Sequence, residues 1–160
     1  MMIASRLMTG VVSVLLGGTV AMATETAEVD SKGIDQLVTQ SALDDVDMRL
    51  REGIEQRGMG LMAVVDHHAN AEKVGLELPP TRTFIFGNPE VGTALMQCEG
   101  SVALDLPQKM VVRQSEEGVV IEWNDPHYLV ERHELEACEL PIDKMSEALT
   151  GLAREAAGGE

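Results

Sequence analysis

The segment from residue 76 to residue 107 constrains the fold more than any other part of the chain. It contains four prolines and both phenylalanines, so regular structure within it has to be short and repeatedly interrupted. Within residues 82–86, Phe84 and Phe86 alternate with other side chains, which is the pattern of a strand with one buried face. The segment therefore predicts short strands and helices rather than one long element.

Two Asx-Pro pairs, Asn88-Pro89 and Asp125-Pro126, each follow a strand-like run that ends near an aromatic residue. Asn and Asp cap helices, and proline is tolerated in the first turn because its missing N–H has no partner there. Each pair therefore predicts a helix start. If the two strands lie side by side, the helix N-termini converge on one pocket, whereas plain helix capping is the simpler interpretation.

The remaining periodicity predicts the other elements. Strands are expected at residues 34–40, 61–65, 82–86, 109–113 and 119–123. Helices are expected at residues 43–54, 70–74, 89–98 and 126–136 and from Pro141 onward, and residues 102–106 are expected to be extended. Ser41 and Asp44 form a predicted capping box, and residues 61–65 a predicted buried strand. This order predicts an α+β fold: a two-layer sandwich with a mostly antiparallel sheet of about five strands and helices on one face.

Residues 1–23 have the features of a removable bacterial export signal. Arg6 precedes an apolar run at residues 7–20, and Ala21-Met22-Ala23 matches the small-x-small cleavage pattern. The run is shorter than the roughly 17 residues that cross a bilayer, which favours cleavage after Ala23 over a membrane anchor. We therefore expect a periplasmic or secreted protein, a flexible leader at residues 24–33 and one domain at residues 34–157.

The chain is strongly acidic, with a formal net charge of −15 at neutral pH. Loss of the signal removes one cation and no acid, so the mature chain is more acidic still. Such a charge is unfavourable for contact with nucleic acid or with an anionic membrane. We expect neither as a partner after signal cleavage.

Cys98 and Cys138 are the two cysteines of the chain, and disulfides persist outside the cytoplasm. One disulfide between them is the first interpretation, with a buried free thiol beside it. The alternative is a thiol ligand for Cu(I) supported by Met96, because soft sulfur ligands select that ion. No cofactor is predicted, although a metal is possible.

Histidines and acids that lie far apart in the sequence form a second candidate cluster. His67, Asp105 and His133 together with Asp66 could act as acid and base or bind a metal, with His67 and His133 as candidate metal ligands. These residues lack the close spacing of a local metal motif, so only the fold can bring them together. No G-x-S-x-G motif supports a serine hydrolase.

These residues resemble a family, the prokaryotic proteins of the domain of unknown function 302 (DUF302). The resemblance covers residues 36–152. It rests on Asp66-His67, Ala71, Val74-Gly75-Leu76, Leu78-Pro79-Pro80-Thr81, Ile85-Phe86-Gly87-Asn88-Pro89, Gly92-Thr93, Leu95-Met96, Asp105-Leu106-Pro107, Asn124-Asp125-Pro126, Tyr128 and Arg132-His133. A departure is His68, where the family commonly has a small residue.

The resemblance implies a fold similar to the TATA-binding-protein-like topology and frequent assembly as a homodimer, but no assigned activity. The expected function is therefore an exported homodimeric module that binds a small molecule or a metal. Its candidate pocket residues are His67, Asn88, Asp105, Asn124, Asp125, Tyr128 and His133. The alternatives are an enzyme that uses His67, Asp105 and His133, and a purely structural partner domain.

Overall fold

The computed structural model describes residues 28–29 and 32–159. The predicted signal peptide lies outside these residues, as does part of the predicted leader. Glu28–Val29, within that leader, form strand β1 and pair with the next strand. None of the helices in the described residues combines the length and the apolar character needed to cross a membrane.

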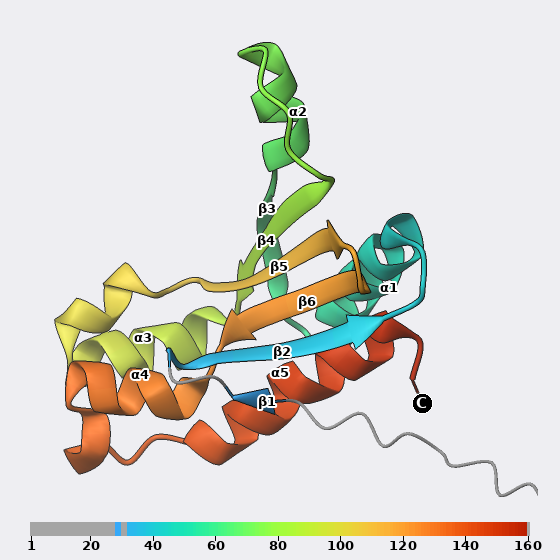
Figure 1. Cartoon of the computed structure of the whole chain (residues 1–160). Coiled ribbons are helices and arrows are strands. Elements are labelled where there is room, and N and C mark those ends of the chain that lie inside the picture. Colours follow the sequence, from blue (N-terminus) through green and yellow to red (C-terminus); the bar gives the residue numbers. More distant parts are fainter. Residues whose placement is uncertain (1–27, 30–31, 160) are drawn as a thin grey trace, which may run out of the picture.

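A six-stranded antiparallel sheet forms the centre of the molecule, in the order β1-β2-β6-β5-β4-β3 (Figure 1). Besides β1, its strands are β2 (Ile34–Thr39), β3 (Gly60–Asp66), β4 (Thr81–Gly87), β5 (Gln108–Ser115) and β6 (Gly118–Asn124). Each neighbouring pair in this order is antiparallel. The predicted α+β class with a mostly antiparallel sheet is therefore confirmed.

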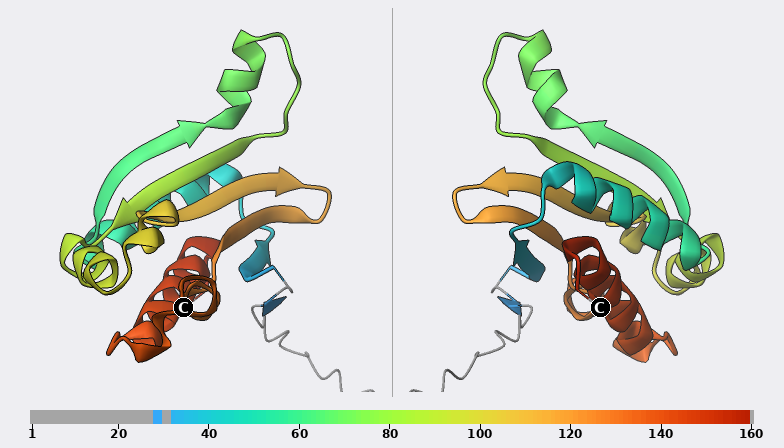
Figure 2. Two further views of the ribbon diagram at one scale, coloured as in Figure 1. Left: turned by 90° about the vertical axis from the view of Figure 1, so that its left-hand side faces the viewer. Right: turned by 90° about the vertical axis from the view of Figure 1, so that its right-hand side faces the viewer.

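Two long helices, α1 (Leu43–Gln56) and α5 (Ile142–Ala157), pack against each other and against one face of the sheet. Figure 2 shows both helices on the same side of the strands. The other helical elements are α2 (His67–Lys73), α3 (Pro89–Cys98), η1 (Gly100–Leu104), α4 (Pro126–His133) and η2 (Leu135–Ala137). The architecture is thus two layers, as the sequence predicts.

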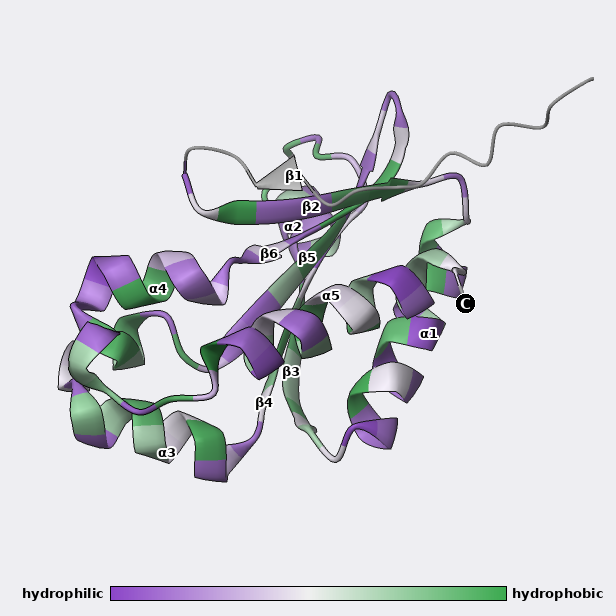
Figure 3. Cartoon of the chain, turned by 90° about the horizontal axis from the view of Figure 1, so that it is seen from below, coloured by the Kyte–Doolittle hydropathy of each residue, from purple (hydrophilic) through white to green (hydrophobic). Residues whose placement is uncertain are grey.

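The main core lies between the sheet and these two helices. Phe84 and Phe86 are fully buried on the covered face, where Leu50 of α1 and Leu152 of α5 meet them within one apolar cluster. Figure 3 shows hydrophobic residues concentrated along the central strands. Burial of side chains this large contributes about 1.5–3 kcal/mol each, so the alternation of Phe84 and Phe86 fixes which face of β4 is inside.

A second, smaller core lies at one end of the sheet. Leu95 of α3, Val102 of η1 and Leu135 of η2 are buried together, and half-buried residues of α4 and α5 pack around them. This cluster packs α3, η1, α4 and η2 together with the start of α5. It forms the base of the candidate site described below.

Strands β3 and β4 are the two outermost strands on one side of the sheet, and α2 projects beyond their far end (Figure 1). Residues 60–87, which comprise β3, α2, β4 and the segment between α2 and β4, are called the arm below. β3 is an edge strand, and Leu61 and Met62 on it are exposed. The prediction of a strand at residues 61–65 is therefore correct, but the prediction that this strand is buried is wrong. A short apolar run is compatible with either environment, and only the strand order distinguishes them.

The local structure differs from the sequence prediction in three places. The hydroxyl of Ser41 donates to the carbonyl oxygen of Ala157 instead of capping α1, whose N-cap residue is Ala42. Helix α2 begins at His67 because the Asp66 carboxylate accepts from the Ala69 N–H, earlier than the predicted cap at Asn70. Residues 100–104 form a 3₁₀ helix in place of an extended segment.

Candidate functional site

Asp105 and His133 form a buried pair above the smaller core. Asp105 follows the last turn of η1, and His133 is the final residue of α4. Oδ2 of Asp105 lies 2.6 Å from Nε2 of His133, and the two residues are only 9% and 7% exposed. The structure therefore brings together two of the three residues predicted to form an acid–base cluster.

Ser101 extends this pair toward the surface. Its Oγ lies 2.8 Å from Nδ1 of His133, and the serine itself is exposed. An ionised carboxylate only accepts hydrogen bonds, so Nε2 of His133 has to donate to Asp105. The neutral ring then carries its proton on Nε2, which leaves Nδ1 to accept from the Ser101 hydroxyl.

Charged side chains flank the three residues on both sides. Nη1 of Arg132 lies 3.4 Å from Oδ1 of Asp105, so the carboxylate faces one cation as well as the imidazole. Glu99 accepts a hydrogen bond from the backbone N–H of Ser101 at 2.8 Å. That backbone N–H holds the pKa of Glu99 below its usual value, so Glu99 is an anion next to the serine.

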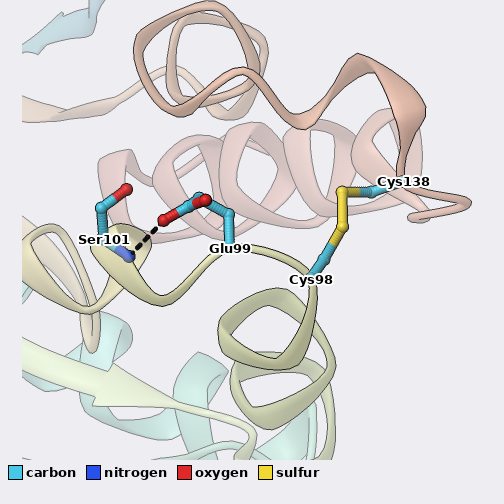
Figure 4. The surroundings of a disulfide bond; sticks show 4 residues. All are labelled: Cys98, Glu99, Ser101 and Cys138. Carbon is cyan, nitrogen blue, oxygen red and sulfur yellow. Dashed lines mark hydrogen bonds between the residues drawn. A yellow bond between two sulfur atoms is a disulfide. The ribbon is translucent and has the colours of Figure 1, made fainter.

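A disulfide joins the two segments that supply the site (Figure 4). Cys98 ends α3 just before Ser101, and Cys138 follows η2 just after His133, with Cα atoms 6.3 Å apart. A cysteine in a disulfide has no thiolate to offer a metal, so the Cu(I) alternative is unsupported in this state. The disulfide covalently links the segment that carries Ser101 to the segment that carries His133.

The two Asx-Pro pairs cap helices as predicted. Oδ1 of Asn88 accepts from the Glu90 N–H at 2.8 Å, and Oδ1 of Asp125 accepts from the His127 N–H at 3.0 Å. The two caps follow β4 and β6, which run in the same direction because both are antiparallel to β5. Both strands therefore finish at the same end of the sheet. However, β5 lies between these strands, so they are not side by side and Gln108 lies between their ends.

Asn124 and Tyr128 are held in structural contacts. The carbonyl oxygen of Asn124 accepts from Nε2 of Gln108 at 3.2 Å. The ring of Tyr128 lies directly over Gly33, where a Cβ atom on residue 33 would come within 2.0 Å of Cγ of the ring. Gly33 also has a positive φ of 70°, so both its backbone and the tyrosine require glycine there.

His67 lies far from the other predicted site residues. Its Nε2 is 2.9 Å from Oγ1 of Thr83, at the arm end of β4. Asp105 lies beyond the opposite end of that strand, where Phe86 pairs with Gln108. Strands rise about 3.3 Å per residue, so His67 is too distant for direct contact with Asp105, and the structure does not place it in the cluster.

A metal centre finds no support in the described part of the chain. It contains no group of three or more His, Cys, Asp or Glu side chains arranged to hold a metal ion. Met96 is 40% exposed on α3 instead of facing a shared site with Cys98. The metal-ligand candidates therefore do not meet one another.

Two shallow grooves lie elsewhere on the surface. The larger, about 670 Å³, runs between α1 and strands β3 and β4, and Arg51, Arg82 and Asp47 line it. The smaller, about 520 Å³, lies along α5 next to His127 and Asp143. Neither is lined by Ser101, Asp105 or His133.

Sequence reasoning did not identify Ser101 or Arg132 as site residues. Ser101 lies 32 residues from His133, and no local spacing links a serine to a histidine at that distance. Ser101 also does not match a G-x-S-x-G motif, because Glu99 and Ala103 stand where that motif has glycine.

Comparison with known proteins gives consistent matches. The family described as "Domain of unknown function DUF302" matches residues 36–152. A protein named fluoride-specific ion channel FluC 1 from Brucella suis is 36% identical over 110 residues, which is 68% of this chain and 43% of that protein. A FluC 1 from Brucella abortus is also 36% identical, over 41% of its length. The chain thus spans less than half the length of these curated relatives.

A solved structure has the same fold. The uncharacterized conserved protein DUF302 from Bacillus stearothermophilus superposes with a TM-score of 0.71 and covers 79% of this chain and 99% of its own, at 19% sequence identity. The family match extends over most of the chain, from the start of β2 to the C-terminal helix. The chain therefore belongs to the DUF302 family.

Proposed function

We propose that this chain is an exported interaction module that acts as a homodimer, with the arm at residues 60–87 as its contact surface. The observation that carries the proposal is the concentration of exposed apolar side chains there. Of the eight large hydrophobic residues exposed in the described chain, five lie on the arm. Val74, Leu76 and Leu78 follow α2 at the tip of the arm, and Leu61 and Met62 lie at the opposite end of β3.

The charge of the arm supports a second copy as its partner. The whole chain has a net charge of −15, so two copies repel each other over most of their surfaces. Residues 60–87 carry two cations and three acids and are therefore nearly neutral. Self-association is least opposed at this surface.

The sheet face opposite the two long helices includes part of the arm and continues onto β5. Val65, Ile85 and Val111 lie on this face, because they alternate with buried residues and belong to neighbouring strands in register. All three are half-buried in the single chain. A symmetric dimer in which each arm contacts this face of the other copy would cover apolar surface on both.

The test of the dimer is light scattering coupled to size exclusion on the mature chain. Val74→Glu/Leu76→Glu adds two charges at the arm tip, and we expect it to convert a dimer to a monomer that still folds. Met48→Glu/Met96→Glu is the matched control, because both methionines are exposed outside the arm. A wild-type monomer, or equal dissociation in both variants, would contradict the proposal.

Export and ligand binding belong to the same proposal and have separate tests. Processing after Ala23 predicts that the periplasmic protein begins at Thr24, which N-terminal sequencing reads directly. A small ligand would fit the groove between α1 and strands β3 and β4, where two arginines lie among acids. Absence of a thermal shift with a panel of divalent metals, Cu(I) and small organic acids and amines would leave only the interaction role.

A second candidate function rests on the curated relatives. Because the chain is 36% identical to part of proteins named fluoride-specific ion channels, we propose that it works beside such a channel as a separate partner. Fluoride efflux from vesicles that contain the Brucella suis channel should change when this chain is added. An arm variant that cannot dimerise separates this role from self-association, and unchanged efflux would contradict it.

A further inference from the structure

We propose that Ser101 is an acyl-transfer nucleophile, activated by His133 and Asp105, for neutral carboxylic esters with an apolar acyl group. This goes beyond the interaction role, which does not use these residues. The three side chains form one hydrogen-bonded row, with 2.8 Å from Ser101 to His133 and 2.6 Å from His133 to Asp105. A serine, a base and an orienting carboxylate in such contact are the arrangement that nucleophilic catalysis requires.

The two imidazole nitrogens exchange the roles that they have in the familiar serine protease triad. There the serine contacts Nε2 and the aspartate contacts Nδ1. Here Ser101 contacts Nδ1 and Asp105 contacts Nε2. The chemistry needs one nitrogen to accept the serine proton and the other to donate to a carboxylate, and either assignment satisfies that requirement.

The proposed reaction proceeds in two balanced halves. Oγ of Ser101 bonds to the ester carbonyl carbon as its proton passes to Nδ1 of His133. Asp105 stabilises the resulting imidazolium through Nε2–H. The ester C–O bond then breaks, and the leaving alcohol takes the proton from Nδ1. Water repeats the sequence on the acyl-serine, which releases the carboxylic acid and restores the Ser101 hydroxyl.

The burial gradient across the row suits this reaction. Ser101 is exposed, so a substrate can reach it, whereas His133 and Asp105 are at most 9% exposed. Buried hydrogen bonds between charged groups are stronger than exposed ones because water does not compete. Val102 and Leu135 of the smaller core and the Cys98–Cys138 disulfide hold both flanking segments in place.

The neighbours of Ser101 indicate the class of substrate. Leu104 follows three residues later in the same 3₁₀ helix, where residues i and i+3 eclipse each other, so it shares a face with Ser101. Its side chain is 76% exposed and offers an apolar contact beside the nucleophile. Glu99 lies next to the serine as an anion, which disfavours acidic substrates.

The test uses an alkyl fluorophosphonate on the oxidised mature chain, read by intact mass and peptide mapping. The probe forms a P–O bond to an activated serine as its P–F bond breaks. We expect one adduct, at Ser101. Ser101→Ala should abolish labelling, and Ser146→Ala, at a half-buried serine on α5, should label like the wild type. Asp105→Asn should slow labelling about 10²-fold or more, as loss of base catalysis does.

A further variant tests the substrate class. Leu104→Asp should slow labelling by a long-chain alkyl probe more than by a methyl probe, since it removes the apolar contact but leaves the three site residues. Thermal melts confirm that each variant is folded before it is compared. Undiminished labelling of Ser101→Ala, or equal rates for the wild type and a folded Asp105→Asn, would overturn the assignment. The oligomeric state is measured in parallel. A failure of the nucleophile proposal can then be distinguished from a failure of the dimer proposal.

Discussion

Oδ2 of Asp105 lies 2.6 Å from Nε2 of His133, and both side chains are buried. Such a pair loses hydration on folding and is favourable only while each partner satisfies the other. The two residues are 28 positions apart in the sequence, and their contact joins the C-cap of η1 to the last residue of α4. The pair therefore stabilises the packing of two short elements, and it also orients His133 for the chemistry proposed for Ser101.

Removal of the Asp105 carboxylate should destabilise the chain. Asp105→Ala leaves Nε2 of His133 buried without its acceptor, and we expect the free energy of unfolding to fall by about 1–3 kcal/mol. Asp143→Ala is the matched control, because Asp143 also contacts a histidine but its side chain is 91% exposed. Its loss should cost less than about 1 kcal/mol. Urea unfolding of both variants gives the comparison, and equal losses would refute the distinction.

The disulfide should stabilise both the chain and the site. Cys98→Ser/Cys138→Ser removes a link between residues 40 positions apart, which typically costs about 2–4 kcal/mol. We expect a lower melting temperature and slower labelling of Ser101. Reducing agent should have the same effects on the wild type and none on the double variant. A wild-type site that is insensitive to reduction would show that the disulfide does not hold it.

Asp35 should reduce stability at neutral pH. Burial, followed by the charge of Asp125, raises the pKa of this 4% exposed carboxyl above its usual 3.8. A raised carboxyl pKa means that the folded state binds the proton more tightly, so this contribution to stability is present at low pH and is lost as pH rises through the folded pKa. Asp35→Asn should therefore raise the melting temperature at pH 7. The exposed Asp45→Asn, measured in parallel, should have little effect.

His127 should have the pH dependence of a histidine that gains partners on folding. Hydrogen bonds from its ring to Asp143 and then to Asp125 raise its pKa above 6.5. The stabilisation is thus complete below the unfolded pKa and is lost as pH rises through the folded one. The ring is half exposed, so the effect is small. NMR titration of the ring should give a pKa above 6.5 that falls in Asp143→Asn, and an unchanged pKa would contradict the assignment.

The sequence predicts the fold well where a local pattern has one physical cause. Alternation at Phe84 and Phe86, capping at Asn88 and Asp125 and the position of α5 each depend on neighbours within a few residues. Prediction from the sequence fails where the hydrogen-bond partner of a residue is distant along the chain. Ser41 contacts Ala157 instead of capping α1, and no local propensity contains that information.

The same limit applies to the site. Asp105 and His133 are identified as candidates by residue type, but their contact depends on how η1 and α4 pack over the smaller core. His67 has the same chemistry and is excluded only because β4 separates it from Asp105. Ser101 escapes detection because its partner is distant in sequence and the pattern of its own segment predicts no helical structure.

The tautomer of His133 tests the central claim most directly. Nitrogen-15 chemical shifts of its imidazole, measured by NMR on the oxidised mature chain, report which ring nitrogen carries the proton. We predict that neutral His133 is protonated on Nε2, toward Asp105, and that Ser101→Ala shifts the Nδ1 resonance. Protonation on Nδ1, or a Nδ1 resonance that does not respond to loss of the Ser101 hydroxyl, would contradict it.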